Sequence, residues 1–309
     1  MSQGDSRPRP CNLFFLMIRR PPRSTLDRSS AASDVYKRQG HQFGANHTQN
    51  NNCNRNNTTA VEPGSGSTIM GYAGICPPDV QNKSNDYFDG ISLSELSAFL
   101  QYRPTCVVLE EVGDTRPPLS IEKSTYTIPA STSFFLKGNG QDAENDILTY
   151  CWEQMNNQVA QMPPRATSTT GPMFRSISPS TSPIRYFPDL KNKYGQWEVL
   201  PSVARTMNFR GTVRDNSLSA GCTDEINVTV NTIATSSPFL VIKPNIDDVI
   251  WQVGDTAEVT WNVAGTTSPP VSCSFIDIFL SVDGGSSYPI LLAKAVPSNG
   301  VAKVIVPNH

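Results

Sequence analysis

The feature that most constrains the fold of this chain is a pair of histidines, His41 and His47, with Gly44 midway between them. A glycine just past the end of a helix can adopt the left-handed conformation that a Cβ atom disfavours, so the chain can turn back there. Such a turn would bring both imidazoles to one point, where they could bind a metal ion. Two histidines around a glycine also occur at an ordinary helix end, so the pair alone leaves both interpretations open.

A methionine-containing turn follows the histidine pair. Residues 67–72, STIMGY, place Met70 23 residues after His47, a reasonable distance for an intervening loop. On its own, Met70 could be a core methionine that fills a gap. Together and in this order, the two histidines, Gly44 and Met70 resemble the metzincin zinc peptidases, whose motif is H-E-x-x-H-x-x-G-x-x-H followed by a Met-turn.

The resemblance covers residues 40 to about 111 and is to secreted bacterial reprolysin-like peptidases. It implies the C-terminal part of an α/β catalytic domain that hydrolyses extracellular proteins or peptides. It also implies that His41 and His47 bind zinc with a third histidine, that Gly44 ends the helix, and that Met70 is the structural Met-turn. Zinc held by three imidazoles keeps a position open for water, and a glutamate takes a proton from that water.

Two positions do not match this family. The first histidine should stand at position 37 and the glutamate at position 38, but the residues are Lys37 and Arg38. An ammonium and a guanidinium have no lone pair to offer near neutral pH, so the catalytic residues are not intact and we expect this chain to be inactive. Tyr72 is placed like a tyrosine that in some metzincins approaches the metal or the transition-state oxyanion, although it could equally be a packed aromatic.

Residues 1–39 differ in character from the rest of the chain. They are rich in Arg and Ser, and the stretch 14–39 resembles translated sequencing-adapter read-through that contaminates some assembled genomes. The loss of the motif coincides with the end of this stretch at Gln39, so a splice within the zinc-binding helix would explain both. We expect residues 1–39 to be a non-native segment. A natural, basic, disordered N-terminus is the alternative, and no signal peptide is visible.

Composition limits the compartment and the partners. The seven cysteines form no CxxC pair, and their scatter through a chain rich in Pro, Asn, Ser and Thr indicates disulfides in a secreted, extracellular or cell-surface protein. Buried free thiols are the alternative. A net charge of −2 suggests no nucleic-acid partner, and no apolar run approaches the ~18 residues of a membrane span. The expected partners are protein or peptide substrates.

A helix should close the peptidase part. Ser92 and Glu95 have the spacing of a capping box, which would start the helix there. The apolar residues that follow at helical spacing should pack beneath the site: Leu93, Leu96, Phe99 and Leu100. Among the cysteines of this part, we expect Cys53 and Cys76 to pair, while Cys106 could pair with a residue upstream.

Strands should dominate after a linker at residues 112–118. Residues 119–235 hold period-two segments separated by turns, with a long irregular insertion near 156–200. The expected strands lie at 126–128, 134–136, 148–152, 209–213 and 226–230. Residues 142–152 resemble the acidic loop and strand that open cadherin-like and immunoglobulin-like bacterial repeats. This resemblance implies a β-sandwich that folds as a unit, in which Cys151 and Cys222 could bridge the two sheets.

A second sandwich, which we expect to be truncated, covers residues 236–309. Alternation predicts strands at 257–263 and 276–280, and Asp283-Gly284-Gly285 predicts a hairpin turn. The predicted fold class is therefore multidomain, with a truncated α/β metzincin part at 40–111 followed by mostly-β immunoglobulin-like sandwiches.

Zinc is the expected cofactor, and calcium is a weaker candidate. Asp142, Glu144 and Asp146 alternate like oxygen ligands of calcium, but the glycine of an EF-hand loop is absent. With only three carboxylates, a solvated turn is the favoured interpretation.

Two functions of different class fit these patterns. The first is a fragment of a secreted zinc metalloendopeptidase with accessory β-sandwiches. The second is a non-enzymatic secreted adhesion or binding protein in which the sandwiches bind and the histidine pair is vestigial. The residues that occupy positions 37 and 38 in the native gene would discriminate between them, because His-Glu there indicates a peptidase.

Overall fold

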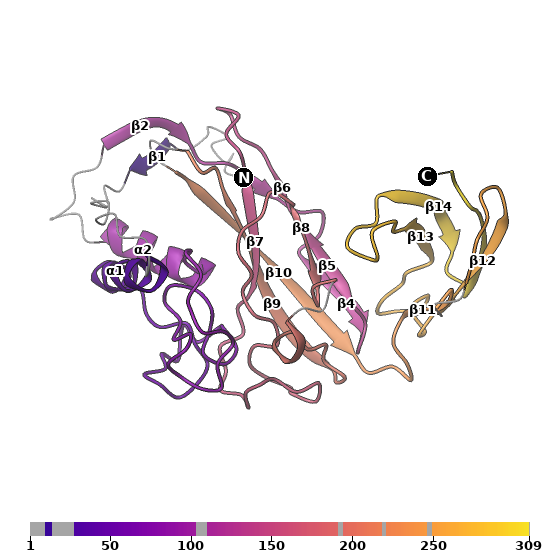
Figure 1. Ribbon diagram of the computed structural model, residues 1–309, viewed down its shortest axis with the longest axis horizontal. Helices are drawn as coiled ribbons and strands as arrows, with labels where there is room; N and C mark the ends of the chain where they lie inside the picture. The colour runs from indigo at the N-terminus through magenta and orange to yellow at the C-terminus, as the bar shows by residue number, and fades with distance from the viewer. Residues whose placement is uncertain are drawn as a thin grey trace, which may run out of the picture.

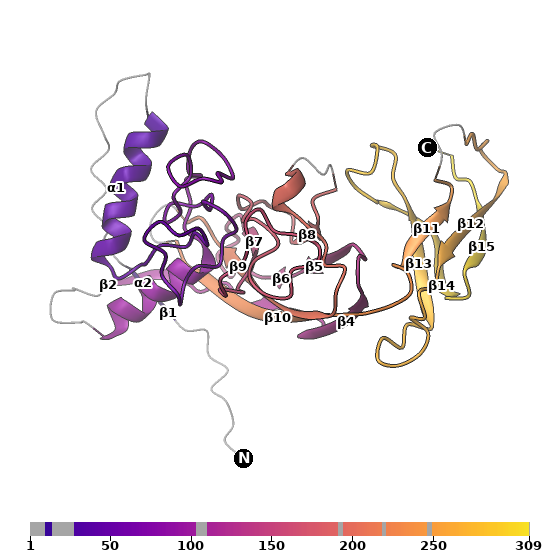
Figure 2. The same ribbon diagram turned by 90° about the horizontal axis from the view of Figure 1, so that it is seen from below.

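The computed structural model describes residues 10–13, 28–102, 110–190, 194–217, 221–245 and 249–308. The chain forms three parts that follow one another along an elongated molecule: a helical and irregular N-terminal part, a central group of strands and a C-terminal group of strands (Figures 1 and 2). The helices are α1 (Arg28–Gln42), α2 (Gly90–Tyr102) and the short 3₁₀ helix η2 (Gly195–Trp197). The strands are β1 (Pro10–Leu13), β2 (Glu110–Thr115), β3 (Leu119–Ser120), β4 (Thr125–Pro129), β5 (Phe134–Lys137), β6 (Asn139–Gly140), β7 (Thr149–Gln154), β8 (Ile184–Phe187), β9 (Arg205–Arg214), β10 (Thr223–Ile233), β11 (Leu240–Lys243), β12 (Thr256–Asn262), β13 (Phe275–Leu280), β14 (Ile290–Pro297) and β15 (Val301–Ile305).

The N-terminal part is two helices joined by a long irregular segment. Residues 28–102 contain no strand, so the α/β class expected for this part stays a prediction. The segment is ordered by side-chain amides in place of a backbone ladder: Asn50 Nδ2 donates to the carbonyl of Ala60 at 2.7 Å and Asn51 Nδ2 to that of Cys76 at 2.6 Å. The predicted disulfide Cys53–Cys76 is confirmed and closes this segment before α2.

The predicted capping box of α2 is wrong. The helix begins at Gly90, and the Oδ1 atom of Asp89 accepts a hydrogen bond from the amide of Ile91 at 2.9 Å, so Asp89 is the N-cap. Ser92 is buried inside the helix, and Glu95 accepts from the amide of Asn46 at 2.8 Å. Asp89, three residues before Ser92, offered the same capping chemistry, and Glu95 instead links α2 to the turn after α1.

The central part is a four-stranded sheet, ordered β4-β10-β9-β7, with the two-stranded sheet β5-β8 facing it across a shared core. Strand β4 is parallel to β10, and the other pairs of the larger sheet are antiparallel. Each expected strand of this part lies in one of these elements, because its alternate residues face the core. The immunoglobulin-like or cadherin-like topology stays a prediction.

The segment near 156–200 is more than an insertion. It contributes β8, η2 and three fully or almost fully buried core residues, Met173, Phe174 and Phe187. These side chains pack on Phe209 of β9 in one aromatic cluster, with ring centroids of Phe187 and Phe209 4.8 Å apart. The sequence pattern missed this role because most of the segment has no regular period.

The suggested bridge between Cys151 and Cys222 is wrong. Cys151 lies in β7 as a buried free thiol, whereas Cys222 is already engaged in a disulfide. Cys106 lies outside the described residues. Burial raises the pKa of the Cys151 thiol well above its usual value, with the charge of Glu153 adding to the shift, so the thiol stays protonated.

The C-terminal part has a core of its own. Two sheets, β11-β12-β15 and β13-β14, enclose buried Val259, Trp261, Ile278 and Val304. The strands expected from alternation are β12 and β13. The predicted Asp283-Gly284-Gly285 turn lies in the connection between β13 and β14, where both glycines have positive φ. Among the described residues, no helix is long and apolar enough to cross a membrane.

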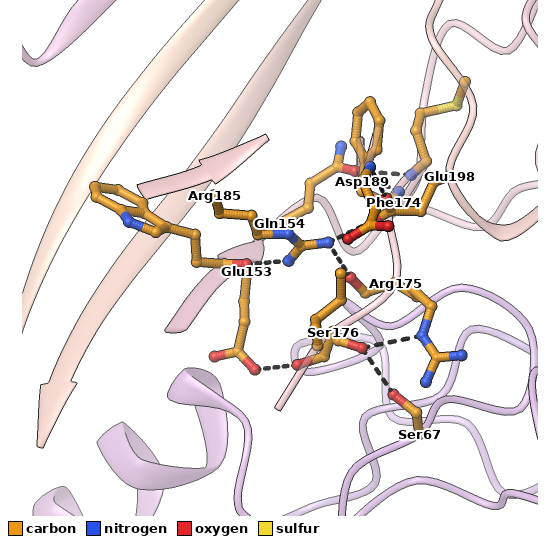
Figure 3. A network of polar contacts seen from close by, with 12 residues as sticks. Ser67, Glu153, Gln154, Phe174, Arg175, Ser176, Arg185, Asp189 and Glu198 are labelled. Carbon is orange, nitrogen blue, oxygen red and sulfur yellow. Dashed lines mark hydrogen bonds and ion pairs between the residues drawn. The ribbon is translucent and has the colours of Figure 1, made fainter. Parts of the chain in front are cut away.

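A buried polar network joins the N-terminal part to the central sheet (Figure 3). Glu153, 1% exposed in β7, accepts hydrogen bonds from the amide of Gly90 at 2.7 Å and from the hydroxyl of Ser176. Ser67 Oγ donates to the carbonyl of Ser176 at 3.2 Å, and the hydroxyls of Tyr87 and Ser176 lie 2.6 Å apart. The start of α2 and the methionine turn are therefore both fixed to the sheet.

A buried ion pair also contacts the segment that carries Ser176. The Arg185 guanidinium pairs with Glu198 at 2.5 Å, and it also donates to the carbonyls of Trp152 and Arg175 (Figure 3). Because these two charges are paired and hydrogen-bonded, their burial is compensated. The pair holds the segment that carries Ser176 in place against β7.

Candidate metal centre

The end of α1 brings the two predicted histidines together. The amide of Ala45 donates to the carbonyl of Gly40 at 2.9 Å, the amide of Gly44 donates to that of His41 at 3.1 Å, and Gly44 has φ of +88°. These are the two hydrogen bonds of a Schellman motif, which a residue with a Cβ atom would strain. The chain reverses there, and the ring of His47 comes to lie 4.7 Å from the ring of His41, edge to face.

Both histidine rings are oriented by backbone carbonyls. The Nδ1 atom of His41 lies 2.9 Å from the carbonyl oxygen of Ala45, and the Nδ1 atom of His47 lies 2.9 Å from that of Asn54. Since a carbonyl only accepts, each Nδ1 donates, and in the neutral ring the lone pair is then on Nε2. Metal-binding histidines are usually oriented by such a contact.

The environment of His47 favours its neutral form. Burial lowers its pKa, and the nearby Lys37 and His41 lower it further, against the hydrogen bond to Asn54, which raises it. A neutral imidazole is the form that binds a metal. The lowered pKa and the hydrogen bond at Nδ1 therefore both favour a neutral His47 ring with a free lone pair on Nε2.

Met70 lies beneath this turn. Its side chain is fully buried in a small cluster with Ala45 and Ile69, and its carbonyl accepts from the amide of Thr48 at 3.3 Å. A Cβ atom added to Gly40 would lie 2.6 Å from the Met70 sulfur, so α1 passes directly over the methionine because position 40 has no side chain. The sequence alone does not show why position 40 must be glycine, because the reason is its close contact with the Met70 side chain.

The carboxylate of Glu62 holds the two sides of the site together. It is 2% exposed and accepts from the hydroxyls of Thr48 at 2.5 Å and Thr68 at 2.7 Å, and from the amide of Ser67 at 2.8 Å. It thus joins the segment after His47 to the methionine turn. Sequence reasoning missed Glu62, because a glutamate in a Pro- and Gly-rich segment usually indicates an exposed loop.

The predicted packing under the site is found in α2. Leu96 packs against the cluster of Ala45, Ile69 and Met70, and Phe99 lies against Gly44, where an added Cβ would approach its ring to 3.2 Å. Leu100 is buried. The amphipathic spacing read from the sequence therefore places this helix correctly, although its N-cap was predicted three residues late.

Lys37 occupies the side of the histidine pair where the motif calls for a third imidazole. It lies one helical turn before His41 on α1, its Nζ donates to the carbonyl of Gly71 at 2.5 Å, and it lies 3.7 Å from the centre of the Tyr72 ring. Burial lowers the pKa of Lys37 to about 8, with the charges of Asp34 and Glu62 opposing the shift. Arg38 is exposed on the same helix.

Tyr72 lies beside the histidines. Its ring is 4.6 Å from that of His47 between centroids, edge to face, and Asn54 Nδ2 lies 3.4 Å from its hydroxyl. In this chain the ring also lies beneath the ammonium of Lys37. The packing interpretation therefore accounts for all its contacts, and its role as a transition-state stabiliser stays a prediction.

The donors in this chain do not make up a three-histidine zinc site. His41 and His47 offer two nitrogen ligands, and the third position is filled by an ammonium that has no lone pair near neutral pH. Within the described residues, no cluster of three or more metal-binding side chains includes either histidine. The oriented pair thus supplies two of the three imidazoles that the motif calls for, and Lys37 stands in the place of the other.

Comparison with known proteins agrees with this geometry. Residues 27–99 match the metallo-peptidase family M12B, reprolysin-like. The match covers less than half of the chain, but it includes α1, both histidines, the methionine turn and most of α2, and it supports a metallopeptidase-type function. It begins ahead of Gln39, so it includes part of the stretch that we expect to be non-native. No curated protein matches the chain.

Proposed function

We propose that this chain carries the zinc-binding end of a secreted zinc endopeptidase that cleaves extracellular proteins, and that the chain as written is inactive. The observation that carries the proposal is the histidine pair, 4.7 Å apart between ring centroids, with both Nδ1 atoms held by carbonyls and Met70 beneath. An ordinary helix end has no need to orient two imidazoles in this way. The similarity to reprolysin-like peptidases over residues 27–99 supports the same class.

Inactivity follows from positions 37 and 38. A general base typically contributes about 10²–10⁴-fold to a rate, and Arg38 cannot take a proton from water. Lys37 replaces an imidazole ligand by a cation, which repels a metal ion. Disulfide bonding, seen at Cys53–Cys76, supports an oxidising, extracellular or cell-surface location.

The test restores the missing ligand. We expect Lys37→His to raise zinc content from well below one ion per chain to about one, because α1 places positions 37 and 41 on the same face. In that background, His47→Ala should remove the zinc, whereas Met70→Leu should keep most of it. The measurement is metal content by emission spectrometry after dialysis.

Lys137→His, which adds a histidine at an exposed position of β5, is the matched control and should leave the zinc content low. Zinc that stays bound in Lys37→His/His47→Ala would contradict the metzincin assignment. Chelator-sensitive cleavage of a denatured protein by the unmodified chain would contradict the proposed inactivity.

One observation favours the second candidate, a non-enzymatic adhesion or binding protein. Lys37 is well accommodated, with a carbonyl partner at Gly71 and the Tyr72 ring below it, so the chain needs no metal at this point. On this alternative, the β-strand parts do the binding. Failure of Lys37→His to gain zinc, with its fold intact by circular dichroism, would favour it.

A further inference from the structure

The loop after β7, residues 155–160, contacts the segment that follows His47. Two hydrogen bonds fix the start of this loop to the central sheet: the amide of Met155 donates to the carbonyl of Asn208 at 2.7 Å, and the Oδ1 atom of Asn156 accepts from the amide of Asn208 at 2.9 Å. Asn156 is buried. The loop is therefore held by the sheet at the place where residues 50–58 meet it.

Asn50 joins the two parts at one end of that segment. Its side chain is buried, and its Nδ2 atom donates to the carbonyls of Ala60 at 2.7 Å and Gln158 at 3.1 Å. Its Oδ1 atom accepts from the amide of Ala160 at 3.3 Å. One side-chain amide thus closes the segment on itself and attaches it to the 155–160 loop.

A second pair of contacts lies at the other end of residues 50–58. The Arg55 guanidinium donates to the carbonyl of Asn157, and the Nδ2 atom of Asn157 donates to the carbonyl of Thr58 at 2.9 Å. Each side of the junction contributes a donor and an acceptor. Together, Arg55 and Asn157 fix the chain directly after Asn54.

Asn54 lies between these fixed points and orients His47. Its carbonyl accepts from His47 Nδ1 at 2.9 Å, its φ is +52°, and the residue is exposed. A positive φ is uncommon for a residue other than glycine, although asparagine tolerates it better than most. An exposed carbonyl in such a conformation can turn toward water unless its neighbours hold it. Cys53, in its disulfide with Cys76, holds one side, and Arg55 holds the other.

We propose that the central part helps to form the histidine site: its 155–160 loop, through the contact of Asn157 with Arg55, positions the Asn54 carbonyl that orients His47. This inference rests on the proposed function, because it concerns the same metal site. Arg55 and Asn157 are positioning residues, since they act on the imidazole through Asn54. The central strands are then part of the peptidase site as well as a neighbouring fold.

The two histidines should respond differently to a change in this loop. His41 takes its carbonyl from Ala45 within the end of α1, so its orientation should not depend on the central part. His47 depends on a residue that the central part holds. An outer partner of a metal-binding histidine typically contributes about 10–100-fold to metal affinity, so losing the support of Asn54 should weaken zinc binding.

The first test needs no metal and uses the unmodified chain. Nitrogen NMR of the imidazoles at a pH of about 8, where an ordinary imidazole is neutral, reports which ring nitrogen carries the proton. In Arg55→Met/Asn157→Leu we expect His47 to lose its preference for a proton on Nδ1, while the signals of His41 stay unchanged. The chain has three histidines, so single substitutions assign each signal.

The second test measures zinc affinity in the Lys37→His background. There we expect Arg55→Met/Asn157→Leu to raise the Kd for zinc by about tenfold. Arg55→Lys, which keeps a cationic donor for the Asn157 carbonyl, should retain most of the affinity. Arg165→Met/Asn52→Leu makes the same exchanges at exposed positions and is the matched control, which should change neither the NMR signals nor the Kd.

The two tests separate this inference from the proposed function. If Lys37→His binds no zinc, the proposed function fails, and the NMR comparison still decides whether the loop positions His47. Unchanged His47 signals in Arg55→Met/Asn157→Leu, or an equal change at His41, overturn the inference. A Kd for zinc equal to that of the matched control also overturns it.

Discussion

The central sheet meets its two neighbours in different ways. Toward the N-terminal part, buried Glu153 and Ser176 bind the start of α2 and the methionine turn, and Gly64 packs so tightly on Trp197 that an added Cβ would lie 2.6 Å from its ring. Toward the C-terminal part, the amide of Phe239 donates to the hydroxyl of Thr132 at 3.0 Å, and each side keeps its own core.

The difference between these two contacts predicts which parts of the chain unfold together. Buried polar groups that satisfy one another across a junction cannot separate without exposing unpaired partners, so the two sides should unfold together. Two separate cores with few shared contacts should unfold independently. We therefore expect calorimetry to resolve two unfolding transitions. The first transition is that of the N-terminal and central parts together, and the second transition is that of the C-terminal strands.

The largest effect should come from removing the Glu153 carboxylate at the contact between the N-terminal and central parts, the first junction. Glu153→Leu keeps a side chain of similar volume but leaves the Gly90 amide and the Ser176 hydroxyl without their acceptor. We expect the free energy of unfolding of the first transition to fall by ~3 kcal/mol. Glu258→Leu, an exposed residue of β12 paired with Lys243, is the control and should change the second transition by less than ~0.5 kcal/mol. Equal effects of the two variants would refute the contrast between the junctions.

Glu153 also illustrates what the sequence could not reveal. Alternation in residues 148–152 predicted β7, since Tyr150 and Trp152 repeat with the period of a half-buried strand. The same pattern gave no reason to bury Glu153, the residue directly after Trp152, because its partners, Gly90 and Ser176, are distant in the sequence. Residues that act through such long-range contacts are invisible to local patterns.

The candidate site likewise contains residues that a local pattern predicts and residues that only long-range contacts reveal. His41, Gly44 and His47 were predictable because the motif is local and its geometry depends on one helix end. Glu62 was not predictable, because its role depends on threonines that the fold brings to it. The position of the α2 cap was missed for a different reason: Asp89 and Ser92 both have capping chemistry, and only the packing of Ser92 inside the helix decides between them.

A moderate effect should come from pH at the first junction. Burial raises the pKa of Asp89 well above its usual value of 3.8, and the charges of Glu153 and Glu62 raise it further. Because the folded state holds this proton while the unfolded state releases it, stability is greatest below the unfolded pKa. It falls as pH rises toward the folded pKa, by on the order of 1 kcal/mol per pH unit.

The variant Asp89→Asn should remove this dependence. An asparagine mimics the protonated acid: its oxygen can accept from the Ile91 amide, and its nitrogen can donate to Glu153. We expect it to stabilise the first transition by on the order of 1 kcal/mol at pH 8 and to have little effect at pH 4, measured by denaturant unfolding. The second transition should not respond. A pH slope that survives in Asp89→Asn would assign the proton to another group.

The smallest effect should come from a substitution at the contact between the central and C-terminal parts, the second junction. Thr132→Val removes the hydroxyl that accepts from the Phe239 amide but keeps the branched shape of the side chain. Because Phe239 is only partly buried, we expect water to replace the lost acceptor and the free energy of either transition to change by about 0.5 kcal/mol or less. Thr127→Val on β4, which leaves the Phe239 contact intact, is the matched control for the loss of a hydroxyl. Differential scanning calorimetry of both variants at matched scan rates gives the comparison. If Thr132→Val merged or shifted the two transitions by several degrees while Thr127→Val did not, the second junction would couple the cores, and the contrast drawn between the junctions would be wrong.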